Sequence, residues 1–591
     1  MTMRKIRRSQ VVSPFGPGAI VDLVGESFVA EDAGNWRGKP EFLRFPRLAS
    51  FLEVSALRTP RQDENLPYFR FPQWLFCSGC RGMERWSFRM EREGETPRCT
   101  TCADRRQLIP MRLIAVCGNG HLTDINWAGW AHSLARKERD QVQCAKAELK
   151  FLNKPAAGSG LGSLEVRCDT CGADRSLEGI TDLGALREAK MSCPGKQPWQ
   201  ASGEAEKCGE TPIAMQRGAS NVYFPDVVSV IDIPPEPLGE DEDSPVARAI
   251  AHADFQFVIE NPRHRLRDEM LRDVAEHTGL ELAEIDLLLD RVLGREEPGS
   301  QESIAPSEWV ALCAPRVQHA PNAEFITRRS RRPEHRAPGS PENELAAVLA
   351  DVVLVDRLRE VRVLTGFKRH TMRKRVSANL AAHPTFLPAA EVFGEGFFLR
   401  FDESAIAEWE TRPEVRNRCS ILAARREAAK AERLPVPRPR FVLLHTLAHA
   451  LLRSTAFEAG YSTSSLRERL YVTGQRGPDM AGVLIYTAAG DTEGTMGGLV
   501  RLGEHERLTK LVCAAIAAAG WCSFDPVCGE TRGQGPSGML LAACHACALV
   551  PETSCEASNR LLDRRLLIDE DYGFFAPLAA ALEQVPGGGA W

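Results

Sequence analysis

The sequence predicts an α+β, multidomain protein with loop-rich N-terminal modules, a helical middle and an α/β C-terminal region. Three observations predict this fold class. The chain has 591 residues, far more than one hydrophobic core organises. Its first 235 residues hold ten of the 18 cysteines, among short apolar runs and turn motifs such as GPG and GNG. Beyond residue 244, apolar residues recur at helical spacing.

Composition limits the class of protein. Hydrophobic residues make up 43% of the chain and charged residues 26%, so it can bury sizeable cores. The longest apolar run, residues 441–452, is too short and polar to span a bilayer. The basic start leads into VVSPFGPG and not into an apolar segment, so we expect no secretory signal and a reducing cytoplasm. A net charge of −5 excludes a polycation that coats nucleic acid.

The first cysteines have the spacing of a zinc ribbon. Two CxxC pairs, LFCSGC and PRCTTC, are separated by eighteen residues. Two such knuckles present four thiolates, which complete a closed tetrahedral shell without a position for substrate. The sequence therefore predicts a structural Zn²⁺ site from Cys77, Cys80, Cys99 and Cys102.

A second set of cysteines is spaced less regularly. Cys168 and Cys171 form a CxxC pair, whereas Cys193 and Cys208 are single thiols closely followed by glycines. We expect these four to form a second zinc site. The segment CGNGHLTDINWAGWAH and the cysteine that follows it could supply a third metal site. The alternative is that its thiol is simply buried and its imidazole simply hydrogen-bonded. The candidate ligands of this third site are Cys117, His121, His132 and Cys144.

The C-terminal cluster has more thiols than a tetrahedral shell needs. ACHACA supplies Cys544 and Cys547, and ETSCE supplies Cys555. The fourth ligand is expected to be Cys528, with Cys522 as its substitute. His545 lies between two of these ligands and is expected to point away from the metal.

The remaining chain divides at an acidic break and a basic, proline-rich segment. We expect an N-terminal region over 1–235, a helical segment over 236–343 that ends in a linker from 316, and a C-terminal domain over 344–591. A strand, a glycine-rich loop and the start of a helix are expected within 481–500. The expected helices of the C-terminal domain are 344–364, 415–432, 438–456 and 503–519.

Support for catalysis is weak. The sequence contains no GxxxxGK[ST] or GxSxG motif, and HTLAH lacks the glutamate of HExxH. His445 and His449 share a helix face, and packed, hydrogen-bonded histidines are the favoured interpretation. The alternative is a metal-dependent hydrolase that adds Asp491 or Glu493. A redox sensor working through the CxxC pairs is a third hypothesis. Gly497 and Gly498 suit either a phosphate contact or a tight turn into a helix.

Two basic runs indicate a surface that faces a polyanion. In a chain of net negative charge, such local runs are the candidate contacts for nucleic-acid phosphates. Solvated side chains are the alternative. The candidate nucleic-acid contacts are Arg328, Arg329, Arg331 and Arg332 in the first run and Arg369, Arg373, Lys374 and Arg375 in the second.

Long segments of the chain resemble the DrmB family of the bacterial DISARM anti-phage defence system. They include RRSQVVSPFGPGAIVDL, CGNGHLTDINWAGWAH and LIYTAAGDTEGTMGGLV, and the match thins between about residues 236 and 345. The C-terminal part also resembles the zinc-binding domain at the end of MrfA-type helicases, through the glycine pair and the cysteine cluster followed by NRLLDR (559–564).

The resemblance implies a subunit with no catalytic residue of its own. It implies a zinc-binding, helicase-accessory domain detached from its motor, and a separate helicase-like partner, DrmA. It further implies that the pair engages DNA, including unmethylated phage DNA with single-stranded ends. From the short apolar runs alone, we expect no membrane partner.

Overall fold

The computed structural model divides the chain into two compact units. Unit 1 comprises residues 1–229 and 362–390, and unit 2 comprises residues 230–361 and 391–591. The chain therefore passes between the units three times. The consecutive domains expected from the sequence do not include this return to unit 1 at residues 362–390. The structure describes residues 6–61, 64–92, 94–139, 144–154, 160–233, 245–261, 264–282, 285–286, 289, 304–313, 324–370, 374–472, 479–487 and 497–584.

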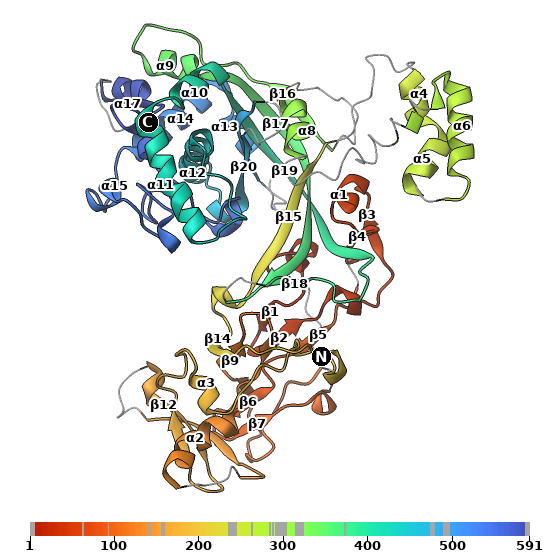
Figure 1. Cartoon of the computed structure of the whole chain (residues 1–591), viewed down its shortest axis with the longest axis vertical. Helices are drawn as coiled ribbons and strands as arrows, with labels where there is room; N and C mark the ends of the chain where they lie inside the picture. The colour runs from red at the N-terminus through yellow and green to blue at the C-terminus, as the bar shows by residue number, and fades with distance from the viewer. Residues whose placement is uncertain are drawn as a thin grey trace. The chain divides into compact units, whose positions relative to one another are not determined.

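Unit 1 consists of small sheets joined by loops, as the sequence predicts (Figure 1). Each of four sheets has three short antiparallel strands, too few to bury a large core. The strand orders are β1(Ile20–Leu23)-β2(Glu26–Ala30)-β5(Tyr68–Arg70), β7(Met83–Arg85)-β6(Trp74–Cys77)-β8(Leu108–Pro110), β10(Leu122–Thr123)-β9(Leu113–Val116)-β14(Ile213–Gln216) and β11(Leu149–Asn153)-β12(Leu164–Cys168)-β13(Asp174–Ser176).

Few helices occur among the described residues of unit 1. The longest, α2, packs against β12 and β13, and its Trp127 and Trp130 are fully buried. A further pair of strands, β3 and β4, is joined by α1, and β4 pairs in parallel with the start of β19(Phe386–Phe401). These elements are α1(Pro46–Phe51), α2(Trp127–Arg139), α3(Ala185–Glu188), β3(Glu41–Leu43), β4(Ala56–Thr59) and β18(Val376–Ser377).

Two long strands run through both units. β17(Leu349–Lys368) and β19(Phe386–Phe401) begin or end in unit 2 and continue into the 362–390 segment of unit 1. The helix expected over 344–364 is therefore wrong, because α9(Pro341–Val348) stops where β17 begins. Nearly every residue of β17 is buried, including the charged Arg359, Glu360 and Arg362, so its polar and apolar side chains do not separate into an exposed face and a buried face.

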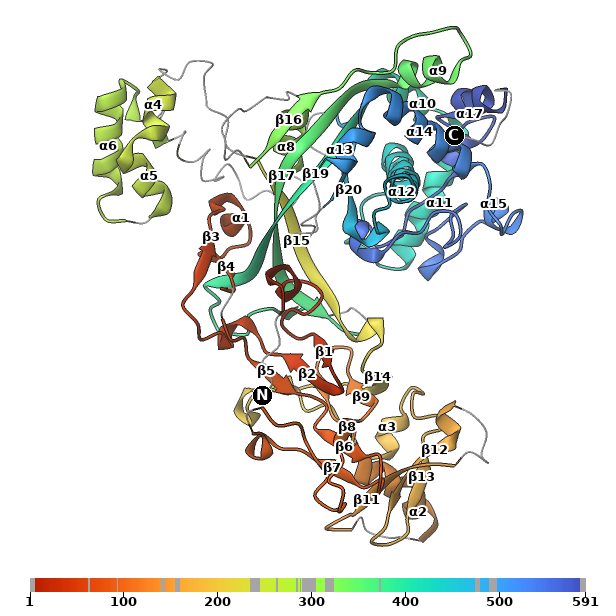
Figure 2. The same cartoon turned by 180° about the vertical axis from the view of Figure 1, so that it is seen from behind.

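Unit 2 places a sheet beside a group of helices. The sheet order is β15(Phe224–Asp232)-β17-β19-β21(Ala481–Thr487)-β20(Leu466–Val472). Figure 1 and Figure 2 show α12(Pro439–Ala459) end-on, surrounded by other elements of this unit. It contacts β20, β21, α11 and α14, so most of its side chains are buried. The helices of unit 2 that follow β19 also include α10(Glu403–Trp409), α11(Pro413–Ala428), α13(Gly498–Leu502), α14(His505–Ala519), α15(Val527–Glu530), α16(Arg565–Ile568) and α17(Ala576–Glu583).

The middle of the chain is helical where the structure describes it. α4(Pro245–Ala251), α5(Ala253–Glu260) and α6(Arg267–Thr278) share one small apolar core, and α8(Ile304–Cys313) follows. Part of the expected linker forms β16(Ile326–Arg329), which pairs with β17. Within the described residues, no helix has both the length and the apolar character needed to cross a membrane. The α+β multidomain class expected from the sequence is confirmed.

Candidate metal centres

Thiols and imidazoles converge in at least four groups within the described residues. Within each group the donor atoms lie within 4.8 Å of one another, and three of the groups are in unit 1. All 18 cysteines are free thiols. We call the groups centre A (Cys77, Cys80, Cys99 and Cys102), centre B (Cys117, His121, Cys193 and Cys208), centre C (His132, Cys144, Cys168 and Cys171) and centre D (Cys522, Cys528, Cys544 and Cys547).

Centre A is built from two knuckles around the β7-β6-β8 sheet. The first knuckle begins where β6 ends at Cys77, and Gly79 donates its N–H to the Cys77 sulfur at 3.3 Å. In the second, the N–H of Cys102 donates to the Cys99 sulfur at 3.3 Å. Burial opposes ionisation of Cys77, but the N–H groups of Cys80 and Gly79 bring its pKa down to about 7. The backbone of the first knuckle is thus arranged to stabilise the Cys77 thiolate.

The sulfur spacing fits a metal and not a disulfide. Four thiolates around Zn²⁺ at about 2.3 Å have sulfur atoms about 3.8 Å apart, whereas disulfide sulfurs are about 2.05 Å apart. The sulfur of Cys77 lies 3.6 Å from that of Cys102, and the sulfur of Cys80 lies 3.7 Å from that of Cys99. Centre A therefore has the dimensions of the closed zinc shell that its sequence spacing predicts.

Centre B joins three separate parts of unit 1. Cys117 follows β9, and Nδ1 of His121 lies 3.4 Å from both the Cys117 and Cys193 sulfurs. A contact with Cys193 lowers the pKa of Cys117 to about 4, with burial opposing it and His121 assisting. Gly195, at φ +68°, donates its N–H to the Cys193 sulfur, and a Cβ there would lie 1.8 Å from the Glu206 carbonyl oxygen. Only glycine fits this turn.

A carboxylate orients the histidine of centre B. Oε1 of Glu206 lies 2.9 Å from Nε2 of His121, so the Nε2–H points at the carboxylate and Nδ1 is left to face the thiols. Lys374 lies 2.6 Å from the same oxygen and lowers the pKa of Glu206. This is the carboxylate–histidine–metal arrangement of zinc proteins, and it was not expected from the sequence.

Replacing Glu206 by Gln is expected to weaken zinc binding at centre B by about 10- to 100-fold. The amide cannot accept the Nε2–H as a charged partner, so His121 becomes a poorer ligand. Competition with a chromogenic chelator measures the loss. Glu210→Gln, an exposed position four residues away, is the control and should release zinc at the wild-type rate. Equal zinc retention in the two variants would contradict the role of Glu206.

Centre C takes its histidine from α2. Nε2 of His132 lies 3.2 Å from the Cys171 sulfur, and Nδ1–H donates to the Ala128 carbonyl at 2.7 Å. That bond fixes the tautomer that leaves Nε2 free to bind a metal. Cys168 ends β12 and Cys171 lies in the turn to β13, so the packing of these strands on α2 brings the pair to His132.

The structure corrects the grouping expected for the middle cysteines. Cys168 and Cys171 are not brought together with Cys193 and Cys208, and the two pairs complete centres C and B respectively. The proposed third set is likewise divided, because Cys117 and His121 belong to centre B while His132 and Cys144 belong to centre C. All four ligands of centre C thus lie, in the sequence, between the two halves of centre B, an arrangement that spacing along the chain does not reveal.

Centre D uses both alternatives for the fourth C-terminal ligand. The Cys522 sulfur lies 3.5 Å from that of Cys544, and Cys528 lies 3.7 Å from Cys547. The fifth thiol, Cys555, is not brought into this group, contrary to its expected place in the shell. Its sulfur lies 3.1 Å from Nε2 of His445.

The two histidines of α12 lie inside unit 2 and not at an open site. Their candidate partners Asp491 and Glu493 lie outside the described residues. Gly497 and Leu499 donate their N–H groups to the Glu395 carboxylate, which occupies the place considered for a phosphate. Two other side chains converge with the histidines of α12. We call this group the α12 cluster: His445, His449, Glu468 and Cys555.

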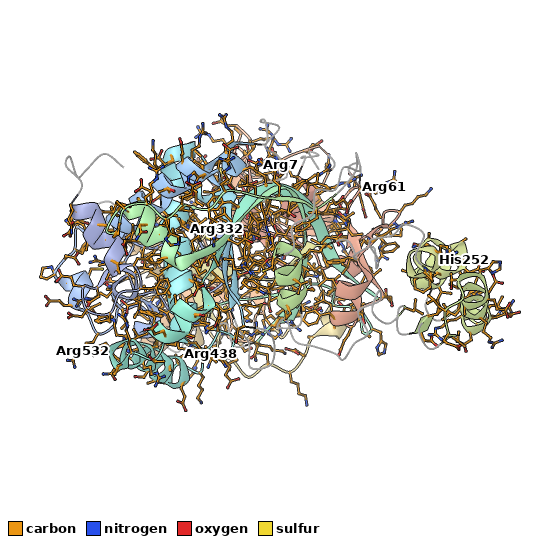
Figure 3. All side chains as sticks on the ribbon, turned by 90° about the horizontal axis from the view of Figure 1, so that it is seen from above. Arg7, Arg61, His252, Arg332, Arg438 and Arg532 are labelled. Carbon is orange, nitrogen blue, oxygen red and sulfur yellow. The ribbon has the colours of Figure 1, made fainter. Side chains whose placement is uncertain are left out.

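The basic residues fall into two classes. On and after β16, Arg328 and Arg329 have side chains 44% and 62% exposed, although they pair with Asp356 and Asp351. Arg332 (Figure 3) and Arg331 are also exposed. In the second run, Lys374 pairs with Glu206 and Arg375 with Asp226. Arg373 lies outside the described residues.

Arg369 is not a nucleic-acid contact. Its side chain is fully buried in unit 1, and it donates to the carbonyls of Gly120 (3.1 Å), Val222 (2.9 Å) and Gly18 (2.7 Å). Burial lowers its pKa to about 9. The expectation that Arg369 meets phosphate was wrong, because a sequence run cannot distinguish an outward arginine from one that satisfies buried carbonyls.

Comparison with known proteins gives three matches. Residues 7–224 match a family described as a domain of unknown function (DUF8724), and residues 447–548 match the MrfA Zn-binding domain. The second match contains all four cysteines of centre D. The chain is also 30% identical over 589 residues to the DISARM protein DrmB of Bacillus paralicheniformis, covering 94% of this chain and 99% of that protein.

Proposed function

Because the chain belongs to the DrmB family of DISARM defence proteins, we propose that it is a non-catalytic, zinc-binding subunit that assists DNA binding by a separate helicase-like ATPase, DrmA. The observation that carries the proposal is the MrfA Zn-binding domain on a chain whose sequence contains no P-loop nucleotide motif. A domain that accompanies a motor in MrfA-type helicases is then expected to act on a motor supplied by another chain. We place the complex in the cytoplasm, where free thiols persist.

The chemistry of the centres supports a non-catalytic role. Centres A to D each present four protein donors, which fill a tetrahedral shell and leave no position for substrate or water. Zinc in such shells is coupled to folding and not to turnover. The zinc ions are therefore proposed to hold loop-rich modules in the shape that the partner and DNA recognise.

The hydrolase alternative has less support. A catalytic metal needs an open coordination position that substrate can reach. His445 and His449 are 0% exposed, and Glu468 and Cys555 complete four donors around them. A hydrolase acting through these histidines would need unit 2 to open.

Copurification with the helicase-like subunit tests the partnership. The tagged chain, coexpressed with DrmA, is expected to retain it through gel filtration and to increase its DNA-stimulated ATP hydrolysis. ATP hydrolysis by this chain alone, or independent elution of the two proteins at micromolar concentration, would contradict the proposal.

Replacing Arg328, Arg329, Arg331 and Arg332 together by alanine is expected to weaken DNA binding by the complex. Each lost phosphate contact lowers the slope of log affinity against log salt by about one. Fluorescence anisotropy across a salt titration measures both effects. The control removes four other exposed charges of unit 2: Arg501, Arg507, Lys510 and Arg532. The same slope in both quadruple variants would contradict a contact at β16.

A further inference from the structure

We propose that the α12 cluster binds a divalent transition-metal ion, Zn²⁺ by its ligand chemistry, at a fifth centre separate from centre D. His445 and His449 come from successive turns of α12, Glu468 from β20, and Cys555 from the residue after η11(Glu552–Ser554). The proposal goes beyond the function above, since it requires neither DNA nor a partner chain.

The donor atoms have the spacing of a tetrahedral shell. For Zn²⁺ with nitrogen, oxygen and sulfur ligands, neighbouring donors are about 3.4 to 3.6 Å apart. Nε2 of His445 lies 3.1 Å from the Cys555 sulfur and 3.2 Å from Oε1 of Glu468. Nε2 of His449 lies 3.6 Å from Oε2 of Glu468. One carboxylate is thus shared between two imidazoles and beside a thiol, with all the donors pointing inward.

The tautomer of His449 calls for a cation between the groups. Its Nδ1–H donates to the Ala548 carbonyl at 2.8 Å, which leaves Nε2 with a lone pair in the neutral ring. Nε2 of His449 and Oε2 of Glu468 face each other, both buried and without a hydrogen-bond partner among the described residues. Two facing acceptors repel unless a proton or a metal ion lies between them, and 3.6 Å is too long for a hydrogen bond.

Charge and burial point to a metal. The side chains of His445, His449 and Glu468 are each 0% exposed, and the two imidazoles are basic groups that lie beside the carboxylate. A buried carboxylate is costly unless a positive charge compensates it. Cys555 also accepts N–H groups from Ala557 (3.3 Å) and Asn559 (3.2 Å), the pattern of a thiolate ligand.

The ligand set favours Zn²⁺ among common divalent ions. Two imidazoles, one thiolate and one carboxylate suit a small tetrahedral ion and exclude Ca²⁺ and Mg²⁺, which require oxygen ligands. His449 also connects the two metal regions, since its Ala548 acceptor directly follows Cys547 of centre D. The fifth centre would therefore fix α12 to β20 and to the centre D loop.

Metal counting on the full-length protein tests the proposal. Protein purified without chelator is expected to contain five zinc ions per chain by plasma mass spectrometry, four in centres A to D and one in the α12 cluster. Glu468→Gln and Cys555→Ser should each contain four. Glu552→Gln, an exposed carboxylate three residues before Cys555, is the matched control and should retain five.

A zinc-edge anomalous difference map of wild-type crystals tests the site without any variant. A peak enclosed by His445, His449 and Cys555 would support the proposal even if the variants fold poorly. Peaks at centres A to D with none in the α12 cluster would overturn it and assign a shared proton to the His–Glu contact. Either result leaves the proposed DNA and partner roles unaffected.

Discussion

Replacing Cys77 and Cys99 together by serine is expected to remove one zinc ion per chain and to unfold the β7-β6-β8 module of unit 1. Around the ligands, the hydrophobic cluster contains Leu75 and Leu108 with the partly buried Trp86 against them, while other apolar residues of these strands pack in a separate core of unit 1. Structural zinc contributes about 10–16 kcal/mol to the folding of such small modules, more than the few apolar side chains around centre A provide. Zinc is therefore expected to supply most of the stability around centre A.

Limited proteolysis and metal analysis measure this effect. The double variant should be cleaved between residues 77 and 110 at protease concentrations that leave the wild type intact. Cys313→Ser, which changes a thiol outside centres A to D, is the control and should keep both its zinc and its protease resistance. A double variant with wild-type zinc content would show that centre A does not bind the metal.

Replacing Arg369 by methionine is expected to destabilise unit 1 by about 3–5 kcal/mol. The guanidinium satisfies three backbone carbonyls from distant segments and lies 4.5 Å from the Phe367 ring centroid. Methionine donates no hydrogen bond, so the buried carbonyls of Val222 and Gly18 lose this donor, and the Gly120 carbonyl keeps only the side-chain amide of Gln197. Because one of them, the Gly120 carbonyl, lies between Cys117 and His121, centre B should also release zinc sooner.

Thermal unfolding followed by tryptophan fluorescence checks this prediction. A loss of this size corresponds to a decrease in Tm on the order of 10 °C for a unit of about 250 residues. Lys374→Met, whose side chain is 48% exposed, removes a nearby charge and should cost less than about 1 kcal/mol. Equal Tm values for the two variants would contradict a structural role for Arg369.

Short-range patterns predicted the parts of the protein whose determinants are local. The two CxxC pairs of centre A lie within 26 residues of the chain beside one small sheet, so their spacing alone identified the ligands. Helices α11 and α14 were predicted where buried residues repeat at helical spacing, whereas α12, also predicted as a helix, is buried on most of its sides. The zinc cofactor and the DrmB resemblance are confirmed by the comparisons, since both depend on motifs several residues long.

Long-range pairing could not be predicted from spacing. β17 was mistaken for a helix because burial on both faces removes the alternation that marks a strand. Cys555 was assigned to centre D because it is near Cys547 in the chain, yet the structure places it beside His445, 110 residues earlier. The signal that could have found this pairing is the HTLAH motif itself, which presents two imidazoles on one helix face.

The nesting of centre C within centre B has a consequence for how the protein is made. On the ribosome, the ligands of centre A emerge within 25 residues of one another, whereas Cys117 precedes Cys208 by 91. All four centre C ligands emerge between His121 and Cys193, so they can capture zinc while centre B still lacks half of its shell. Synthesis order therefore favours loading A, then C, then B, and limits mispairing among ten thiols that would otherwise compete for the same ion.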